Sequence, residues 1–138
     1  MRSTTTLVGS LIVILAAFAA GYSVGQEKKM NTRVYELRTY TTLPGRLPAL
    51  NERFAEHTLK LFEKHGMKNE MYWVPLDEDN KLIYFVSHES REAADKSWKA
   101  FQADPDWQKV RTESEKDGKI VEKVERVWMK LADYSPGK

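Results

Sequence analysis

Val34-Tyr-Glu-Leu-Arg-Thr-Tyr-Thr41 is the most informative segment of this chain for its architecture. Aromatic and β-branched side chains alternate with other residue types along it, which predicts a strand from Arg33 to Tyr40. Pro44 and Gly45 come soon after, and they indicate a turn because proline fixes its own φ and glycine accepts a positive φ. A strand that ends in a tight turn therefore begins the folded domain.

The remaining periodicity indicates two helical segments and three more strands. Gly66 stands where a left-handed helix end is expected, Ser90 and Asp104 are suitable helix caps, and Pro105 is tolerated at a first helical position. The order β-α-β-β-α-β, with the second helix broken at Pro105, is the α+β ferredoxin-like plan with an antiparallel four-stranded sheet. After the first strand, the expected elements are a helix over 47–65, strands over 67–75 and 82–86, helices over 91–103 and from 105 toward Gly118, and a strand over 119–131.

Two helices on one side of a sheet leave its other face uncovered. Because side chains alternate between the faces of a strand, we expect Tyr35, Leu37 and Thr39 to point toward the helices. The opposite row, which includes Glu36 and Arg38, would then lie on the uncovered face. A second copy of the chain, placed sheet to sheet, would bury that row, so we predict a homodimer.

Two segments resemble the signature segments of a known family. Val34 to Thr41 running into Pro44-Gly45, and Trp98-Lys-Ala-Phe101 running into Asp104-Pro-Asp-Trp107, are similar to those of the NIPSNAP family. The similarity extends from about Arg33 to Leu131. It implies a ferredoxin-like domain that pairs into a dimeric α/β barrel, and it implies no particular reaction, because the bacterial members have no agreed biochemical activity.

Glu36 and Arg38 are the charged residues that need an explanation. They lie two apart on one strand, hence on one face, and a buried unpaired charge costs several kcal/mol. They are expected to pair with each other, with polar groups of the last strand, or with a ligand. Two interpretations stay open: a structural ion pair, or a polar pocket in the barrel in which Arg38 anchors an anionic group and Tyr40 or Tyr84 supplies a ring and a hydroxyl.

His57 comes three residues after Phe54 and four before Leu61, so helical spacing places it on or beside the buried stripe of the first helix. It is expected to be either a hydrogen-bonded core residue or part of a ligand site. No nucleophile–base arrangement and no close metal-ligand spacing is visible, so we assign no catalytic residue, metal or cofactor. The candidate ligand-binding residues are Glu36, Arg38, Tyr40, Tyr84 and His57.

Composition limits the classes of partner. With 138 residues and 41% hydrophobic content, the chain can bury one core but hardly two. A net charge of +2 gives no strong field for nucleic acid or an anionic membrane surface. The absence of cysteine excludes disulfides, a thiol nucleophile and a thiolate metal site. The expected partners are a second copy of the chain and a small molecule.

The first 25 residues read as a targeting segment. Arg2 precedes an uncharged stretch, 7–25, which is typical of a cleaved signal peptide and would export the domain. The alternatives are an uncleaved membrane anchor, because nineteen residues at about 1.5 Å each just cross a hydrocarbon core of roughly 30 Å, and a true start at Met30. The membrane would be contacted only through this segment. The expected organisation is a signal or anchor over 1–25, a linker over 26–32, the domain over 33–131 and a tail over 132–138.

Three classes of function remain open from the sequence. The first is a homodimeric small-molecule-binding domain without a catalytic motif. The second is a cofactor-light enzyme of the oxygenase or isomerase type, which rests on the implied dimeric-barrel fold alone. The third is a protein-interaction adaptor, which the family's eukaryotic members suggest.

Overall fold

The structure, a computed structural model, describes residues 32–136 and contains one antiparallel four-stranded sheet. Aromatic and β-branched residues, which favour extended backbone, make up about half of the residues in three of the four strands. The strand order and the antiparallel pairing confirm the ferredoxin-like plan. In spatial order the strands are β2 (Lys68–Trp73), β3 (Lys81–His88), β1 (Val34–Thr42) and β4 (Val121–Met129).

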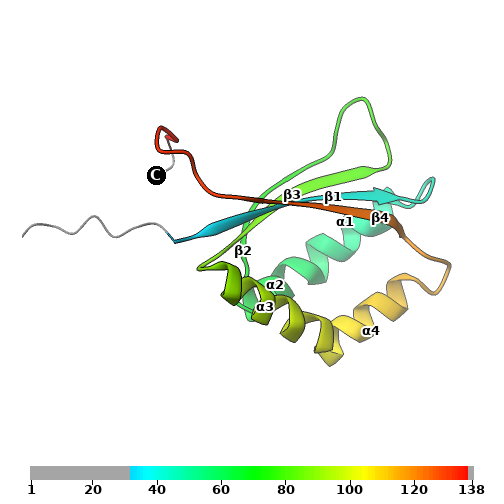
Figure 1. Cartoon of the computed structure of the whole chain (residues 1–138). Coiled ribbons are helices and arrows are strands. Elements are labelled where there is room, and N and C mark those ends of the chain that lie inside the picture. The colour runs from blue at the N-terminus through cyan, green and yellow to red at the C-terminus, as the bar shows by residue number, and fades with distance from the viewer. Residues whose placement is uncertain (1–31, 137–138) are drawn as a thin grey trace, which may run out of the picture. The chain divides into compact units, whose positions relative to one another are not determined.

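The helices of residues 32–136 all lie on one side of the sheet (Figure 1). The Ser90 side chain accepts a hydrogen bond from the backbone of Ala93 and caps α3, and Asp104 accepts one from Asp106 and caps α4. The break at Pro105 is therefore confirmed. The helices are α1 (Leu47–Arg53), the π-helical turn η1 (Phe54–Thr58), α2 (Leu59–Lys64), α3 (Arg91–Ala103) and α4 (Pro105–Ser114).

The hydrophobic core lies between the helices and the sheet. Phe54 packs edge-on against Tyr84 at 5.2 Å between ring centroids, and Phe62 packs against Phe101 at 5.0 Å. Full burial of such side chains contributes about 1.5–3 kcal/mol each. The other buried apolar residues of this core are Leu47, Leu50, Leu61, Met67, Leu82, Val86 and Ile120.

The predicted orientation of β1 is wrong. Glu36 is fully buried, and its carboxylate contacts Trp98 of α3, so the row that contains Glu36 and Arg38 points toward the helices. The reason is the pairing with β3, which sets Arg38 opposite Tyr84 and Glu36 opposite Val86. Opposed residues of an antiparallel pair have their side chains on the same face of the sheet. Tyr84 and Val86 belong to the core, so Arg38 and Glu36 lie on the core side as well.

The other face of the sheet carries no helix, as predicted, but it is apolar. We call it the open face. Met71 and Trp73 of β2 are 60% and 42% exposed, and Val127 of β4 is 52% exposed. From the strand registers, the open face also contains Tyr35, Leu37, Ile83, Phe85 and Met129.

Residues 1–31 and 137–138 lie outside the described part of the chain. The predicted signal peptide or anchor over 1–25, and most of the predicted linker, fall there and stay predictions. No helix among residues 32–136 is long and apolar enough to cross a membrane. The unit from Asn31 to Lys138 is compact and contains the sheet, the helices and the core.

Candidate functional site

Glu36 is the centre of a buried polar cluster between β1, β3 and α3. Arg38 Nη1 donates to its Oε1 at 2.6 Å, and the indole Nε1 of Trp98 donates to its Oε2 at 2.6 Å. His88 Nε2 lies 3.2 Å from the same Oε2. The Arg38 guanidinium in turn lies over the Trp98 ring, 4.3 Å from its centroid, and contacts the Tyr40 hydroxyl at 3.3 Å. The predicted pairing of Glu36 with Arg38 is confirmed.

The surroundings of the cluster keep its two charges in place. Burial by itself would raise the pKa of Glu36, but hydrogen bonds from His88, Trp98 and Arg38 outweigh it and hold that pKa below its ordinary value. Burial acts against the charge of Arg38 too, yet nearby tyrosines and Glu36 leave its pKa raised. The pair is therefore ionised at neutral pH, and its charges satisfy each other.

Unpartnered polar atoms surround this ion pair. Among residues 32–136, six buried side-chain nitrogen or oxygen atoms have no hydrogen-bonding partner in the protein. Four of them belong to the cluster or to its neighbours across the strands: Arg38 Nε, Tyr84 Oη, His88 Nδ1 and Trp128 Nε1. A buried polar atom without a partner costs about 1–3 kcal/mol, so such a concentration is unusual for a purely structural core.

The cluster offers mostly donors. Arg38 Nε and Trp128 Nε1 only donate, and burial next to Tyr40 raises the pKa of Tyr84 well above its usual range, so that the Tyr84 hydroxyl keeps its proton. His88 Nε2 donates to the Glu36 carboxylate, which leaves Nδ1 as an acceptor in the neutral imidazole. The donors of Arg38, Trp128 and Tyr84 suit an oxygen-rich, negatively charged ligand.

Of the five predicted ligand-binding residues, four come together and one does not. Tyr40 packs edge-on against Tyr84, 5.4 Å between centroids, next to the Glu36–Arg38 pair. His57 lies elsewhere, on η1, beside the buried stripe and not in the core: its side chain is 49% exposed. A π-helical turn holds more residues than an α-helical one, so Thr58 takes the buried position, with its hydroxyl donating to the Arg53 carbonyl.

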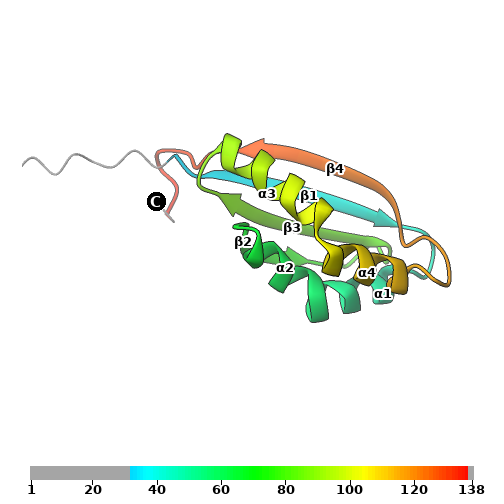
Figure 2. The ribbon, with the colours of Figure 1, turned by 90° about the horizontal axis from the view of Figure 1, so that it is seen from below.

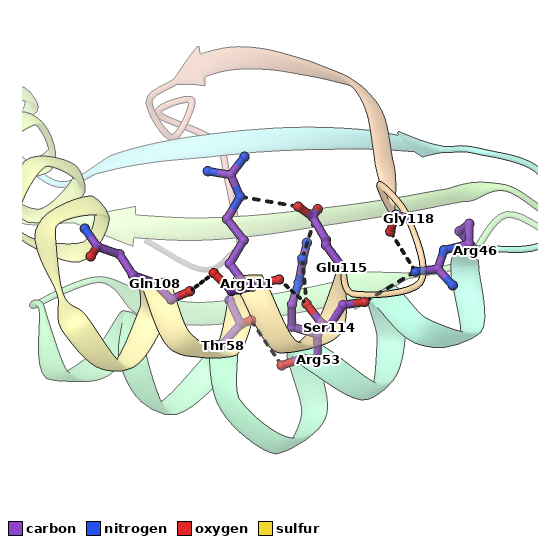
Figure 3. A network of polar contacts seen from close by, with 9 residues as sticks. Arg46, Arg53, Thr58, Gln108, Arg111, Ser114, Glu115 and Gly118 are labelled. Atoms are coloured by element: carbon purple, nitrogen blue, oxygen red, sulfur yellow. Dashed lines mark hydrogen bonds and ion pairs between the residues drawn. The ribbon is translucent and has the colours of Figure 1, made fainter.

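His57 instead lines a cleft of about 320 Å³ between α1, η1 and α4. Figure 3 shows the polar contacts beside this cleft. Arg53 Nη1 contacts Ser114 Oγ at 3.2 Å and Glu115 at 3.4 Å, and Arg46 Nη2 donates to the carbonyl of Gly118 at 3.0 Å. The arginines thus tie α1 and the segment before it to the end of α4. Acidic and basic side chains alternate around the cleft, which favours no ligand class.

Sequence reasoning missed His88 and Trp98 as members of the cluster. His88 lies beyond the strand predicted over 82–86, but it is the last residue of β3 and is buried. The alternation that puts Tyr84 and Val86 on the helix side would have placed His88 there too. No periodicity reveals that the indole nitrogen of Trp98 meets Glu36.

A family comparison agrees with these features. The NIPSNAP family model matches residues 35–136, which is most of the chain. The chain belongs to the NIPSNAP family. No curated protein matches the sequence. The family assignment confirms the resemblance that the sequence shows around Val34 to Thr41 and Trp98 to Trp107.

Solved structures of other NIPSNAP proteins share the fold. A NIPSNAP family protein of unknown function from Agrobacterium tumefaciens is 22% identical, with a TM-score of 0.67 over 78% of this chain and 95% of that one. An uncharacterised NIPSNAP-like domain protein from Burkholderia xenovorans is 14% identical, with a TM-score of 0.67 over 77% and 90%. SnoaB from Streptomyces nogalater, a cofactor-independent oxygenase, is 15% identical, with a TM-score of 0.56 over 76% and 98%. At these identities the likeness concerns the fold alone.

Proposed function

We propose that this NIPSNAP domain is a homodimer that binds a small anionic molecule at the Glu36–Arg38 cluster. The observation that carries the proposal is the gathering of four unpartnered polar atoms around one buried ion pair. An anionic group would accept hydrogen bonds from Arg38 Nε and Trp128 Nε1, and from the Tyr84 hydroxyl after small side-chain movements. Such a ligand would bind on the helix side of one subunit, and not between two sheets as the sequence led us to expect.

Access to this cluster would be from β4. Val124, Arg126 and Trp128 lie on the helix side of β4, opposite Tyr40, Arg38 and Glu36 in the register. Val124 is 44% exposed, and Figure 2 shows that α3 and α4 leave much of β4 uncovered. A small molecule entering there would meet the edge of the cluster without unfolding of the core.

The homodimer is supported by the open face. Its exposed Met71 and Val127 are the two ends of one apolar row across the sheet, and the exposed Trp73 packs on Phe85 of that row. Large contiguous apolar surfaces mark association sites. A two-fold related copy would present the same residues to them, so the contact would be self-complementary. Dimerisation and ligand binding would then use opposite faces of the sheet.

Binding is tested with benzoate as the probe, by calorimetry and by tryptophan fluorescence. We expect saturable binding by the wild type and at least a tenfold loss for Arg38→Met. Arg53→Met is the matched control, because Arg53 also lies over a tryptophan, Trp107, and pairs with a glutamate, Glu115. Equal binding by wild type and Arg38→Met would contradict the proposal. Absence of any benzoate binding, together with absence of co-purified small molecules in native mass spectrometry, would favour the adaptor hypothesis.

A cofactor-light enzyme is the second candidate. It is favoured by the buried contact of 3.2 Å between Glu36 and His88, because a carboxylate beside an imidazole can hold and transfer a proton. The oxygenase SnoaB has the same fold. If native mass spectrometry identifies a bound compound, its conversion and its oxygen uptake are measured with wild type and with His88→Gln. If His88→Gln binds the compound but no longer converts it, the result would support an enzyme. If neither the wild type nor His88→Gln converts the compound, the result would contradict an enzyme.

A further inference from the structure

Arg38 and Arg126 lie directly opposite each other on neighbouring strands. The register of β1 and β4 pairs them, so both side chains leave the sheet on the helix side. Like charges at directly opposite positions of an antiparallel pair are destabilising. A negative group between or beside the two cations would remove this repulsion.

The described chain supplies only one such group. Glu36 neutralises Arg38 at 2.6 Å. Glu125, the sequence neighbour of Arg126, points to the open face and pairs there with Lys123 at 2.8 Å. Within residues 32–136, Arg126 has no ion pair with a carboxylate. The site therefore has one more cation than it has carboxylates.

A second arginine, Arg91, lies on the Trp128 ring next to Arg126. The Arg91 guanidinium lies 3.8 Å from the centroid of the Trp128 ring, and that of Arg126 lies 5.4 Å from it. Both are cation–π contacts, which fix the guanidinium groups without neutralising them. Arg91 has a carboxylate partner in Asp95, at 2.9 Å, but that contact is on the exposed surface of α3 and is screened by solvent.

We propose that Arg126, with Trp128 and Arg91, forms a second anion subsite, so that the ligand of this protein is a dicarboxylate. This inference rests on the proposed function: one carboxylate of the ligand would meet the donors at Arg38, and the other would lie beside Arg126. Bidentate contact between a guanidinium and a carboxylate gives such a subsite its specificity. A monocarboxylate leaves Arg126 without a partner and binds more weakly.

Isophthalate and benzoate test this inference with the purified full chain, because they share one ring and differ by one carboxylate. We expect isophthalate to bind the wild type at least tenfold more tightly than benzoate. In Arg126→Met, the affinity for isophthalate should fall to that for benzoate, while the affinity for benzoate should equal that of the wild type. The control is Arg111→Met, which removes an exposed arginine far along α4 and should change neither affinity. Because Arg126 is exposed, the variant should fold, and its urea midpoint verifies this.

The two proposals fail in different ways. One such result is that the wild type binds isophthalate and benzoate with equal affinity while Arg38→Met has lost benzoate binding. That result would overturn the second subsite and leave the proposed function standing. Unchanged isophthalate binding by Arg126→Met would overturn the subsite as well. Failure of both compounds to bind the wild type would overturn the proposed function and the subsite with it.

Discussion

The indole Nε1 of Trp98 donates a 2.6 Å hydrogen bond to the buried carboxylate of Glu36 and thereby connects α3 to β1. Trp98→Phe keeps an aromatic ring in the core but removes this donor. A hydrogen bond to a charged group contributes about 1.5–3 kcal/mol, so we expect the free energy of unfolding to fall by that amount. Urea denaturation measures it.

Trp107→Phe is the matched control for that variant. Trp107 packs on Phe101 at 4.5 Å between centroids and lies under Arg53, and within residues 32–136 its indole nitrogen makes no hydrogen bond. Trp107→Phe should lower the free energy of unfolding clearly less than Trp98→Phe does. Equal losses in the two variants would mean that ring size, and not the hydrogen bond to Glu36, determines the effect.

Glu36 and Arg38 should be strongly coupled in stability. Glu36→Gln leaves the buried guanidinium without its counter-charge, and removal of one partner of a buried pair costs about 3–5 kcal/mol. In the double variant Glu36→Gln/Arg38→Met no unpaired charge remains, so its loss should be at least about 1 kcal/mol smaller than the sum of the two single losses. Additive losses in urea denaturation would show that the two charges do not depend on each other.

Stability should fall in acid partly through Asp104. Hydrogen bonds from Lys64 at 2.8 Å and from His65 at 2.6 Å outweigh its burial and hold the pKa of Asp104 well below the ordinary value of about 3.9. A carboxyl whose pKa is lowered by folding stabilises the protein above about pH 4, and this contribution is lost as the pH falls further. Thermal unfolding between pH 7 and pH 2 should show that loss in the wild type.

Asp104→Asn keeps a side chain that caps helices well but carries no charge. The variant should melt at a lower temperature than the wild type at pH 7, and the difference should shrink toward pH 2. Asp106→Asn is the control, because the exposed Asp106 also contacts Lys64, at 3.1 Å. A constant difference between wild type and Asp104→Asn at all pH values would contradict this role of the carboxylate.

The open face should carry the dimer contact. Val127→Asp places a charge among exposed apolar side chains on β4, so it should convert a dimer of the unit 31–138 into a monomer without unfolding it. Sedimentation velocity at micromolar concentration measures the mass, and circular dichroism verifies the fold. The control is Glu122→Gln, an exposed substitution on the same strand. A wild type that is already monomeric would refute the proposed homodimer.

Much of the fold is predictable because its signals are local. Gly66 has a φ of 76°, Ser90 and Asp104 cap the helices as expected, and Pro105 begins α4. Caps, turns and hydrophobic periodicity depend on residues a few positions apart, so one sequence contains them. The pairing of Glu36 with Arg38 was predictable for a similar reason, since residues two apart on a strand share a face.

The helix register was not predictable in the same way. His57 fits an α-helical stripe by spacing, yet the π-helical turn at 54–58 moves it toward solvent and buries Thr58. The stability of such a turn depends on what packs against it from the sheet and from α4, and no pattern within the helix records that.

The sequence by itself determined the order of the elements, the helix ends and the ion pair of β1, because neighbouring residues along the chain produce each of them. Only the tertiary structure decided which face of β1 meets the helices. Alternation divides a strand into two rows without saying which row is inside. That choice follows from the pairing of β1 with β3, which sets Arg38 opposite Tyr84. Contacts between residues distant in sequence thus outweigh the polarity of the row.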